Sequence, residues 1–403
     1  MTVLKVTTFR VVGVTLGIVL LAPAVVVSPM SASAAPPVSC PKAQPPITPP
    51  ATPSPPAVDL AHRKVGGDAL ATSGLAIPEG APMAPAVTAT AWVVADLNSG
   101  EVLGGCAPHD RRTPASVQKL LLAAALMPRL DSEQVIEVKR EDLADLDPAS
   151  SLMGVVEGGR YSIEDLWLGL LMKSGNDAAN VLARVGGGER GRQGGVDAMN
   201  DEARRLQANQ SHAATPSGLD GPGQYTSAYD LALIARATFA REDFRRYMAT
   251  RVAQVPAQQG QPAIELVNDN TLLDRYPGML GGKTGFTSLA RQTYVGVAEQ
   301  NGRRLAVTLL GAETAPLGSL GEAIALLDWG FALDPAASVG TLVTAEEEKK
   351  RARWWMLTGL GFSAVLALVL VVARPWRRTG ARGQRRRSGQ PAPHASPDDG
   401  SLP

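Results

Sequence analysis

Twenty consecutive residues near the C-terminus, from Trp354 to Ala373, carry no charged side chain. A helix of that length rises about 30 Å, which matches the hydrocarbon core of a bilayer. Trp354 and Trp355 at one end and Trp376 just beyond the other stand where aromatic residues gather at membrane interfaces. The sequence therefore predicts one transmembrane helix over residues 354–373, and this helix limits where every other segment can fold.

Basic residues orient the predicted helix. Seven arginines and two aspartates lie between residues 374 and 403, whereas the cations just before the helix are Lys349, Lys350, Arg351 and Arg353. An excess of Lys and Arg marks the cytoplasmic side of a membrane helix. We expect residues 374–403 to form a basic, disordered cytoplasmic tail, and residues 341–353 to form a juxtamembrane segment outside the membrane.

The N-terminus has the layout of a secretory signal peptide. Lys5 and Arg10 precede an uncharged run over residues 11–27, and the small residues 31–35 follow it. We expect a signal peptide over residues 1–34, with an uncleaved membrane anchor as the alternative. The protein is then expected in the cell membrane as a single-pass protein whose main domain is extracytoplasmic.

The first part of the exported region is poor in residues that could form a core. Ten prolines occur between residues 36 and 56, and such a segment behaves as a stiff, extended spacer. We therefore expect a proline-rich extracytoplasmic linker over residues 35–85. The following residues 86–340, about 255 in all, suffice for one large domain.

Charge and composition exclude several classes of protein. The chain has 39 Lys and Arg against 38 Asp and Glu, a formal net charge of +1, which excludes a polybasic nucleic-acid binder. Its two cysteines and four histidines show no zinc-binding spacing. We expect no metal and no other cofactor.

Strand-like segments stand at both ends of the domain region, with helix-like segments between them. Residues 90–97 and 101–103 predict one hairpin, and residues 291–299 and 304–310 predict a second around Asn301-Gly302. The expected helices cover about 115–127, begin at Ser162, follow Asp177, cover 227–239 and, near the end, cover 317–332. This order predicts an α/β fold in which an antiparallel sheet from both chain ends packs on helices, with an all-helical insertion.

Ser116 and Lys119 open the first of these helices. The eight residues after Lys119 are apolar, so the helix is expected to be buried. Lys119 lies one turn after Ser116 on the same face, where its amine can reach the hydroxyl. Burial lowers the pKa of an amine, and a neutral amine can take the proton of a serine nucleophile. A solvated helical face is the alternative, but it explains the apolar run poorly.

Two more motifs carry chemistry. Ser174-Gly175-Asn176 stands in a polar turn between two expected helices, where ordinary helix punctuation is the alternative. Lys283-Thr284-Gly285 follows Gly282, but Pro277 stands where a phosphate-binding loop needs its first glycine. That spacing excludes a nucleotide-binding loop.

Ser-x-x-Lys, Ser-x-Asn and Lys-Thr-Gly in this order resemble the motif set of the penicillin-binding protein and serine β-lactamase superfamily. Within it, residues 91–330 resemble the low-molecular-weight serine D-alanyl-D-alanine carboxypeptidases. The resemblance implies a β-lactamase/transpeptidase-like fold for residues 86–340. It also implies an enzyme that removes the terminal D-Ala from peptidoglycan stem peptides through an acyl-enzyme, and that β-lactams acylate.

The resemblance further implies a role for each site residue. The implied catalytic residues are Ser116 as nucleophile, Lys119 as general base and Ser174 as proton relay to the leaving D-Ala. The implied substrate-binding residues are Asn176, Lys283, Thr284, Gly285 and Phe286, with Lys283 and Thr284 on the terminal carboxylate. Backbone N–H groups of Ser116 and Phe286 would form the oxyanion hole.

Several alternatives stay open at this point. Cys40 and Cys106 either form a disulfide, which the exterior permits, or remain two free thiols. A D,D-endopeptidase uses the same groups. A class A-like β-lactamase is expected to carry Glu-x-x-Leu-Asn, and Glu202 does not begin such an element. A catalytically silent wall-binding or sensor protein on the same fold is expected to have lost Ser116, Lys119 or Lys283.

Overall fold

The computed structural model of the chain describes residues 37–48, 56–258 and 260–343. The predicted signal peptide 1–34, transmembrane helix 354–373 and cytoplasmic tail 374–403 lie outside these residues, as does most of the juxtamembrane segment. Among the residues that the structure describes, no helix has the length and apolar character needed to cross a membrane.

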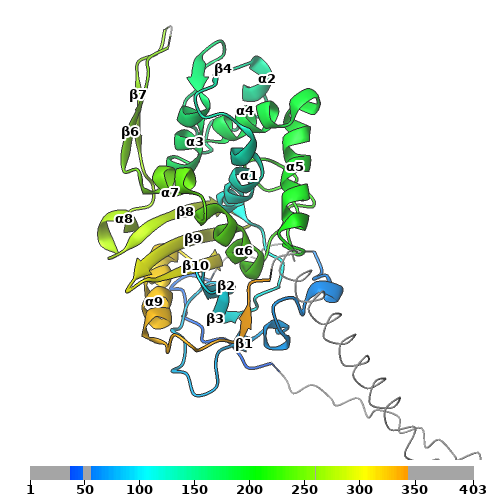
Figure 1. Cartoon of the computed structure of the whole chain (residues 1–403), viewed down its shortest axis with the longest axis vertical. Coiled ribbons are helices and arrows are strands. Elements are labelled where there is room, and N and C mark those ends of the chain that lie inside the picture. Colours follow the sequence, from blue (N-terminus) through cyan, green and yellow to red (C-terminus); the bar gives the residue numbers. More distant parts are fainter. Residues whose placement is uncertain (1–36, 49–55, 259, 344–403) are drawn as a thin grey trace, which may run out of the picture. The chain divides into compact units, whose positions relative to one another are not determined.

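A seven-stranded antiparallel sheet from both ends of the described chain forms the centre of the fold (Figure 1). The strands are β1 (Leu75–Ala76), β2 (Ala91–Asp96), β3 (Glu101–Cys106), β8 (Met279–Thr287), β9 (Arg291–Gln300), β10 (Arg303–Ala312) and β11 (Gly340–Thr341). They lie in the order β1-β3-β2-β10-β9-β8, and β11 also pairs with β3. The sheet therefore begins at an edge made by the two chain ends and finishes at β8, which carries the Lys-Thr-Gly motif.

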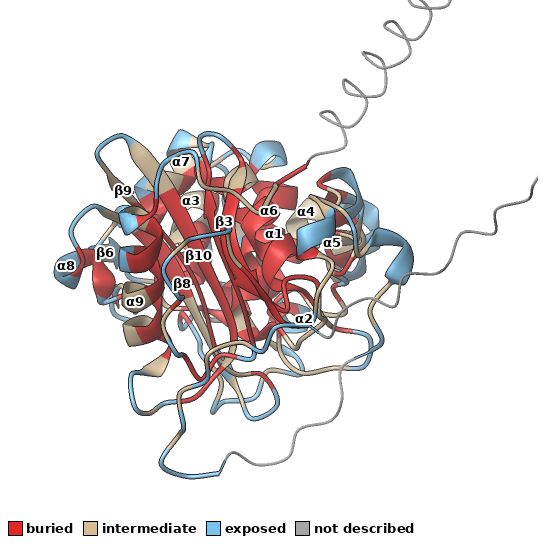
Figure 2. Ribbon diagram, turned by 90° about the horizontal axis from the view of Figure 1, so that it is seen from below, coloured by how far each residue is buried: buried red, intermediate tan, exposed pale blue. Residues whose placement is uncertain are grey.

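Helices cover both faces of the sheet, which explains why β2 is buried along its whole length. On one face Thr308 of β10 donates a hydrogen bond from its hydroxyl to the carbonyl of Ala228, at 2.9 Å, at the start of α6 (Ala228–Phe239). On the other face, Gly330 of α9 (Gly318–Ala332) packs against side chains of the sheet. The red, buried residues of Figure 2 gather along these contacts.

A helical region is inserted between β3 and β8, and Figure 1 shows it beside the sheet. Its helices are α1 (Lys119–Leu126), α2 (Arg140–Leu143), α3 (Ile163–Met172), α4 (Asn176–Gly186), α5 (Gly191–Arg205), α6, α7 (Glu242–Ala249) and α8 (Leu272–Arg275). Every residue of α1 is buried, as its apolar sequence predicts. The side chain of Ser162 accepts the N–H of Asp165 at the start of α3, so the predicted capping box is confirmed.

The prediction of an all-helical insertion is wrong in one respect. Two small antiparallel sheets lie within it, formed by β4 (Val135–Glu137) with β5 (Arg160–Ser162) and by β6 (Val252–Val255) with β7 (Ile264–Val267). These strands have three or four residues each, which is at or below the shortest run in which alternation identifies a strand.

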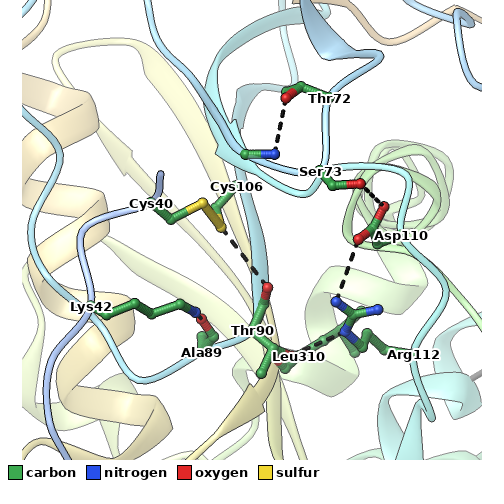
Figure 3. The surroundings of a disulfide bond; sticks show 11 residues. Cys40, Lys42, Thr72, Ser73, Ala89, Thr90, Cys106, Asp110, Arg112 and Leu310 are labelled. Carbon is green, nitrogen blue, oxygen red and sulfur yellow. Dashed lines mark hydrogen bonds and ion pairs between the residues drawn. A yellow bond between two sulfur atoms is a disulfide. The ribbon is translucent and has the colours of Figure 1, made fainter. Parts of the chain in front are cut away.

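Part of the segment predicted as a linker packs against the domain. β1 is one strand of the main sheet, and the N–H of Leu75 donates to the carbonyl of Val38 at 2.8 Å. Lys42 forms an isolated bridge with Val87, and its amine donates to the carbonyl of Ala89 at 2.5 Å (Figure 3). The boundary predicted at residue 86 therefore falls too late, because proline-rich segments can dock by single backbone contacts that composition does not reveal.

A disulfide between Cys40 and Cys106 fixes this segment to β3, with 5.9 Å between the two Cα atoms (Figure 3). It closes a loop with a sequence separation of 66 residues. Closing a loop of that size restricts the unfolded chain, and the chain-entropy relation gives about 4 kcal/mol of stabilisation.

We therefore expect the double variant Cys40→Ser/Cys106→Ser to lower the free energy of unfolding of the exported domain by about 4 kcal/mol. Denaturant unfolding of the oxidised domain and the variant measures this difference. Reducing agent should destabilise the unmodified domain and leave the variant unchanged. Equal stability of the two proteins in oxidising buffer would contradict the account of the disulfide.

Candidate active site

A cleft of about 830 Å³ lies between the helical region and the β8 edge of the sheet. Six of the predicted site residues line it, and these are Ser116, Ser174, Asn176, Thr284, Gly285 and Phe286, the last with an exposed ring. The two predicted lysines, Lys119 and Lys283, are buried beside it. The structure thus brings together residues from three distant parts of the chain.

Ser116 stands where the chain enters the buried helix α1. It belongs to a short 3-10 helix, Ala115–Gln118, that continues directly into α1. Ala115 has a φ of 49°, a left-handed conformation that is strained for a residue with a side chain. The hydroxyl of Thr293 in β9 donates to the carbonyl of Pro114 at 2.9 Å, which holds this entry against the sheet.

Lys119 reaches three oxygen atoms with its amine. Its Nζ lies 2.8 Å from Ser116 Oγ, 2.7 Å from Asn176 Oδ1 and 2.7 Å from the carbonyl oxygen of Ser217. Burial, and after it the nearby Lys283 cation, holds the pKa of Lys119 well below the ordinary value of a lysine, while the Asp177 carboxylate opposes the shift. Lys119 is thus placed to be a neutral amine beside the serine.

The turn that carries Ser174 and Asn176 is fixed by the carboxylate next to it. Asp177, buried in the first turn of α4, accepts the backbone N–H groups of Met153, Gly154 and Val155 at 2.7–3.1 Å. These bonds hold the loop that forms one wall of the cleft against the start of α4. Sequence reasoning treated Asp177 only as the marker of a helix start and missed this role.

The hydroxyl of Ser174 is buried at the cleft and has no hydrogen-bond partner among the described residues. Its residue is 5% exposed, lines the cleft and has a φ of 61°. Its Oγ makes no hydrogen bond to any residue that the structure describes. A buried hydroxyl without a partner is costly, so an unbonded hydroxyl in a cleft is suited to contact a ligand.

β8 brings the third motif to the edge of the sheet. A Cβ atom at Gly285 would lie 2.8 Å from the backbone nitrogen of Ser116, so only glycine lets the strand approach the nucleophile this closely. Phe286 follows it with an exposed ring. This approach brings the β8 backbone beside the N–H of Ser116, as an oxyanion hole formed by Ser116 and Phe286 requires.

Lys283 supplies the cation of the site. It is 1% exposed, and its amine donates to the carbonyl of Thr284 at 2.7 Å. Burial lowers the pKa of Lys283 to about 8, the carboxylate of Asp269 opposes this change, and the cation of Lys173 adds to it. Lys173 and Asp269 form an ion pair of 2.6 Å next to Ser174.

Comparison with known proteins identifies the family. Residues 79–314 match the model of the family described as D-alanyl-D-alanine carboxypeptidase. D-alanyl-D-alanine carboxypeptidase DacB2 of Mycobacterium tuberculosis is 42% identical over 269 residues, which cover 66% of this chain and 90% of that protein. The chain belongs to the D-alanyl-D-alanine carboxypeptidase family.

Solved structures of the family agree in fold. A D-alanyl-D-alanine carboxypeptidase from Mycobacterium tuberculosis superposes with a TM-score of 0.62 at 40% identity, covering 66% of this chain and 99% of that one. Penicillin binding protein 6B from Escherichia coli superposes with a TM-score of 0.57 at 34% identity, covering 63% of this chain and 81% of that one. The α/β, transpeptidase-like fold and the assignment to a serine carboxypeptidase family are thus confirmed.

The relatives differ in length. The chain spans 64% of D-alanyl-D-alanine carboxypeptidase DacD of Escherichia coli, to which it is 36% identical over 259 residues. The similarity therefore concerns the domain that carries the three motifs.

Two further residues, Ser217 and Asp269, belong to the candidate site of this chain and were not predicted from the sequence. The carbonyl of Ser217 accepts a hydrogen bond from Lys119, although the two residues lie 98 positions apart. Asp269 comes from the loop before α8 and faces Lys283. A backbone carbonyl leaves no sequence signal, whereas Asp269 could have been suspected only from its place fourteen residues before Lys283 in a region with no other motif. No group of three metal-binding side chains occurs among the described residues.

Proposed function

We propose that the protein is a membrane-anchored, exported serine carboxypeptidase that removes the terminal D-Ala from peptidoglycan stem peptides. One observation carries the mechanism: the amine of Lys119 lies within 2.8 Å of Ser116 Oγ, Asn176 Oδ1 and Ser217 O. A neutral amine has two N–H donors and one lone pair. When the donors bind the amide oxygen and the carbonyl, the lone pair is left for the serine hydroxyl.

Acylation then follows from the positions of the groups. Lys119 takes the proton of Ser116, and Oγ attacks the carbonyl carbon of the penultimate D-Ala. The developing oxyanion is stabilised by the backbone N–H groups of Ser116 and Phe286. The carbon–nitrogen bond breaks, and the leaving D-Ala nitrogen receives a proton through the free hydroxyl of Ser174. Water hydrolyses the resulting ester and regenerates Ser116.

Lys283 and Thr284 would orient the substrate. A buried cation next to a hydroxyl suits the terminal carboxylate of a peptide ending in D-Ala-D-Ala. β-Lactams carry a carboxylate and a reactive amide in a similar arrangement, so they are expected to acylate Ser116 as inhibitors. D,D-Endopeptidase and β-lactamase activities use the same groups and are the alternatives on this fold, and a silent wall-binding protein is the non-enzymatic one.

The membrane anchor is the second part of the proposal. The uncharged residues 354–373 and the arginines after them support a single-pass protein with a cytoplasmic tail. β11 ends at Thr341, so few residues separate the domain from this segment. A protease added outside intact cells should then cleave the domain and leave a tag at residue 403 protected.

The activity is tested by incubating the purified extracytoplasmic domain with a peptide that ends in D-Ala-D-Ala and measuring released D-Ala. The same domain is incubated with a penicillin. We expect D-Ala release and a long-lived penicilloyl adduct. Absence of both would refute the enzyme, and rapid turnover of penicillin without D-Ala release would instead assign a β-lactamase.

The pH dependence of the reaction should reflect the two buried lysines. Catalysis rises as Lys119 loses its proton, and it falls when Lys283 loses the charge that binds the carboxylate. Because the pKa of Lys283 is about 8, kcat/KM should decline above that pH, by about tenfold per unit at the alkaline end. The variant Lys283→Arg keeps its charge, so it should lose this alkaline decline in a pH profile measured on the D-Ala-D-Ala peptide. An unchanged decline in the variant would assign the limb to another group.

A further inference from the structure

A second cavity adjoins the catalytic cleft. Its volume is about 490 Å³, and Leu219 lines both spaces. The loop before β5 also borders both, the second cavity with Asp145 and Leu146 and the catalytic cleft with Asp147 and Ser150. The two cavities are therefore neighbours, with Leu219 and this loop between them.

The second cavity lies close to the catalytic base. Ser217 lines it, and the carbonyl of the same residue accepts the hydrogen bond from Lys119. The wall is held in place by Gln118, whose side-chain amide donates to the carbonyl of Thr215 at 3.3 Å and to Gln224 Oε1 at 3.0 Å. Ser217 thus lies between Lys119 and the second cavity.

The orientation of β8 indicates which end of a substrate reaches the second cavity. Lys283, which would hold the terminal carboxylate, precedes Gly285 in the strand, whereas Thr287 follows it. The hydroxyl of Thr287 donates to Asp220 Oδ1 at 2.8 Å, next to Leu219. A peptide lying along β8 with its carboxylate at Lys283 therefore leaves the cleft past Leu219.

The second cavity is lined by a cation, Arg192, which forms a weak ion pair with Asp145. Arg192, in the first turn of α5, lies 3.5 Å from the carboxylate of Asp145, and the two side chains are 39% and 85% exposed. Exposed ion pairs at this distance contribute little free energy. A carboxylate of a bound ligand can replace Asp145 at small cost, while the nearby side chain of Val196 offers an apolar surface.

We propose that the second cavity is a subsite for the part of the peptide that precedes D-Ala-D-Ala, and that Arg192 binds a carboxylate there. A γ-linked D-glutamyl residue upstream of the scissile bond carries such a free α-carboxylate. The inference rests on the proposed function, because it concerns the substrate of the same cleft. Contacts to remote parts of a substrate raise kcat/KM without taking part in the chemistry.

The test compares substrates and variants. Two pentapeptides ending in D-Ala-D-Ala are used. One has a γ-linked D-glutamyl residue with a free α-carboxylate, and the other has the α-amide of that residue. The third substrate is an acetylated tripeptide that also ends in D-Ala-D-Ala and lacks the glutamyl residue. Arg192→Gln should lower kcat/KM for the glutamyl peptide by up to about fivefold, and leave the α-amide, the tripeptide and the rate of acylation by penicillin unchanged.

Two further variants sharpen the result. Asp145→Asn removes the competing carboxylate, and asparagine tolerates the φ of 62° at this position, so kcat/KM for the glutamyl peptide should rise. Arg190→Gln removes a cation of α5's N-terminal region that pairs with Asp197 and does not line the cavity, so it should have no effect. Equal losses for both pentapeptides, or no loss in Arg192→Gln, would overturn the subsite. Failure of the unmodified domain to release D-Ala from any of the three peptides would instead overturn the proposed function itself.

Discussion

Replacing Ser116 with alanine is expected to lower D-Ala release and acylation by penicillin by at least about a thousandfold. The change removes the hydroxyl that would form the ester, and among the residues that the structure describes Ser116 is the one whose hydroxyl is hydrogen-bonded to Lys119. Initial rates of D-Ala release and labelling by a fluorescent penicillin measure the two steps.

The fold should survive this substitution, because serine and alanine differ by one oxygen at the mouth of the cleft. Ser99→Ala makes the same chemical change in the exposed turn between β2 and β3, away from the cleft, and should keep full activity. Retention of more than a few per cent of D-Ala release in Ser116→Ala, with Ser99→Ala unaffected, would show that another group is the nucleophile.

The second large effect concerns the general base. Lys119→Arg keeps a cation at the position but cannot supply a lone pair, since arginine does not lose its proton in a protein. We expect the rate of acylation by penicillin to fall about 10²- to 10⁴-fold, the usual contribution of a positioned acid or base. Stopped-flow labelling at several pH values measures the rate.

Lys119 is fully buried, so a variant that fails to fold must be recognised. Lys119→Met keeps an unbranched side chain that is one heavy atom shorter and uncharged, and thermal unfolding of both variants reports on folding. Lys64→Arg, a change on an exposed lysine paired with Asp68, is the matched control and should leave the rate unchanged. Folded variants at position 119 that still react at the unmodified rate would remove Lys119 from the mechanism.

The sequence predicts the elements whose signals are local. The second hairpin turns at Asn301-Gly302, and both residues have positive φ, as the type I′ turn of a two-residue hairpin requires. α6 begins after Ser227, whose side chain accepts the N–H of Asp230. These signals lie within a few residues of the structure that they specify.

Other elements depend on contacts that the sequence does not display. α5 contains Gly191, Gly194 and Gly195, which argue against a helix. The close approach to α4 requires Gly194 and Gly195, since a Cβ atom at Gly194 would lie 2.3 Å from the carbonyl oxygen of Gly187 and one at Gly195 would lie 2.3 Å from that of Ala183. Tertiary packing here outweighs helix propensity.

In the candidate site too, some contacts follow from local spacing in the sequence and others depend on tertiary packing. The spacing of Ser116 and Lys119 predicts that their side chains share a helical face, and they lie 2.8 Å apart. The contact of Lys119 with Ser217 joins residues 98 positions apart, and it exists because the Gly218 region packs against Ala115. A Cβ atom at Gly218 would lie 2.0 Å from the carbonyl oxygen of Ala115, so this glycine is needed for the approach.

The central claim is that Ser116 forms the acyl-enzyme. The most direct measurement treats the unmodified domain with a penicillin, digests it and locates the adduct by tandem mass spectrometry. The account predicts one penicilloyl group, carried by Ser116 and absent after treatment of Ser116→Ala. An adduct on Ser174 or on another residue, or no adduct in a domain that releases D-Ala, would contradict it.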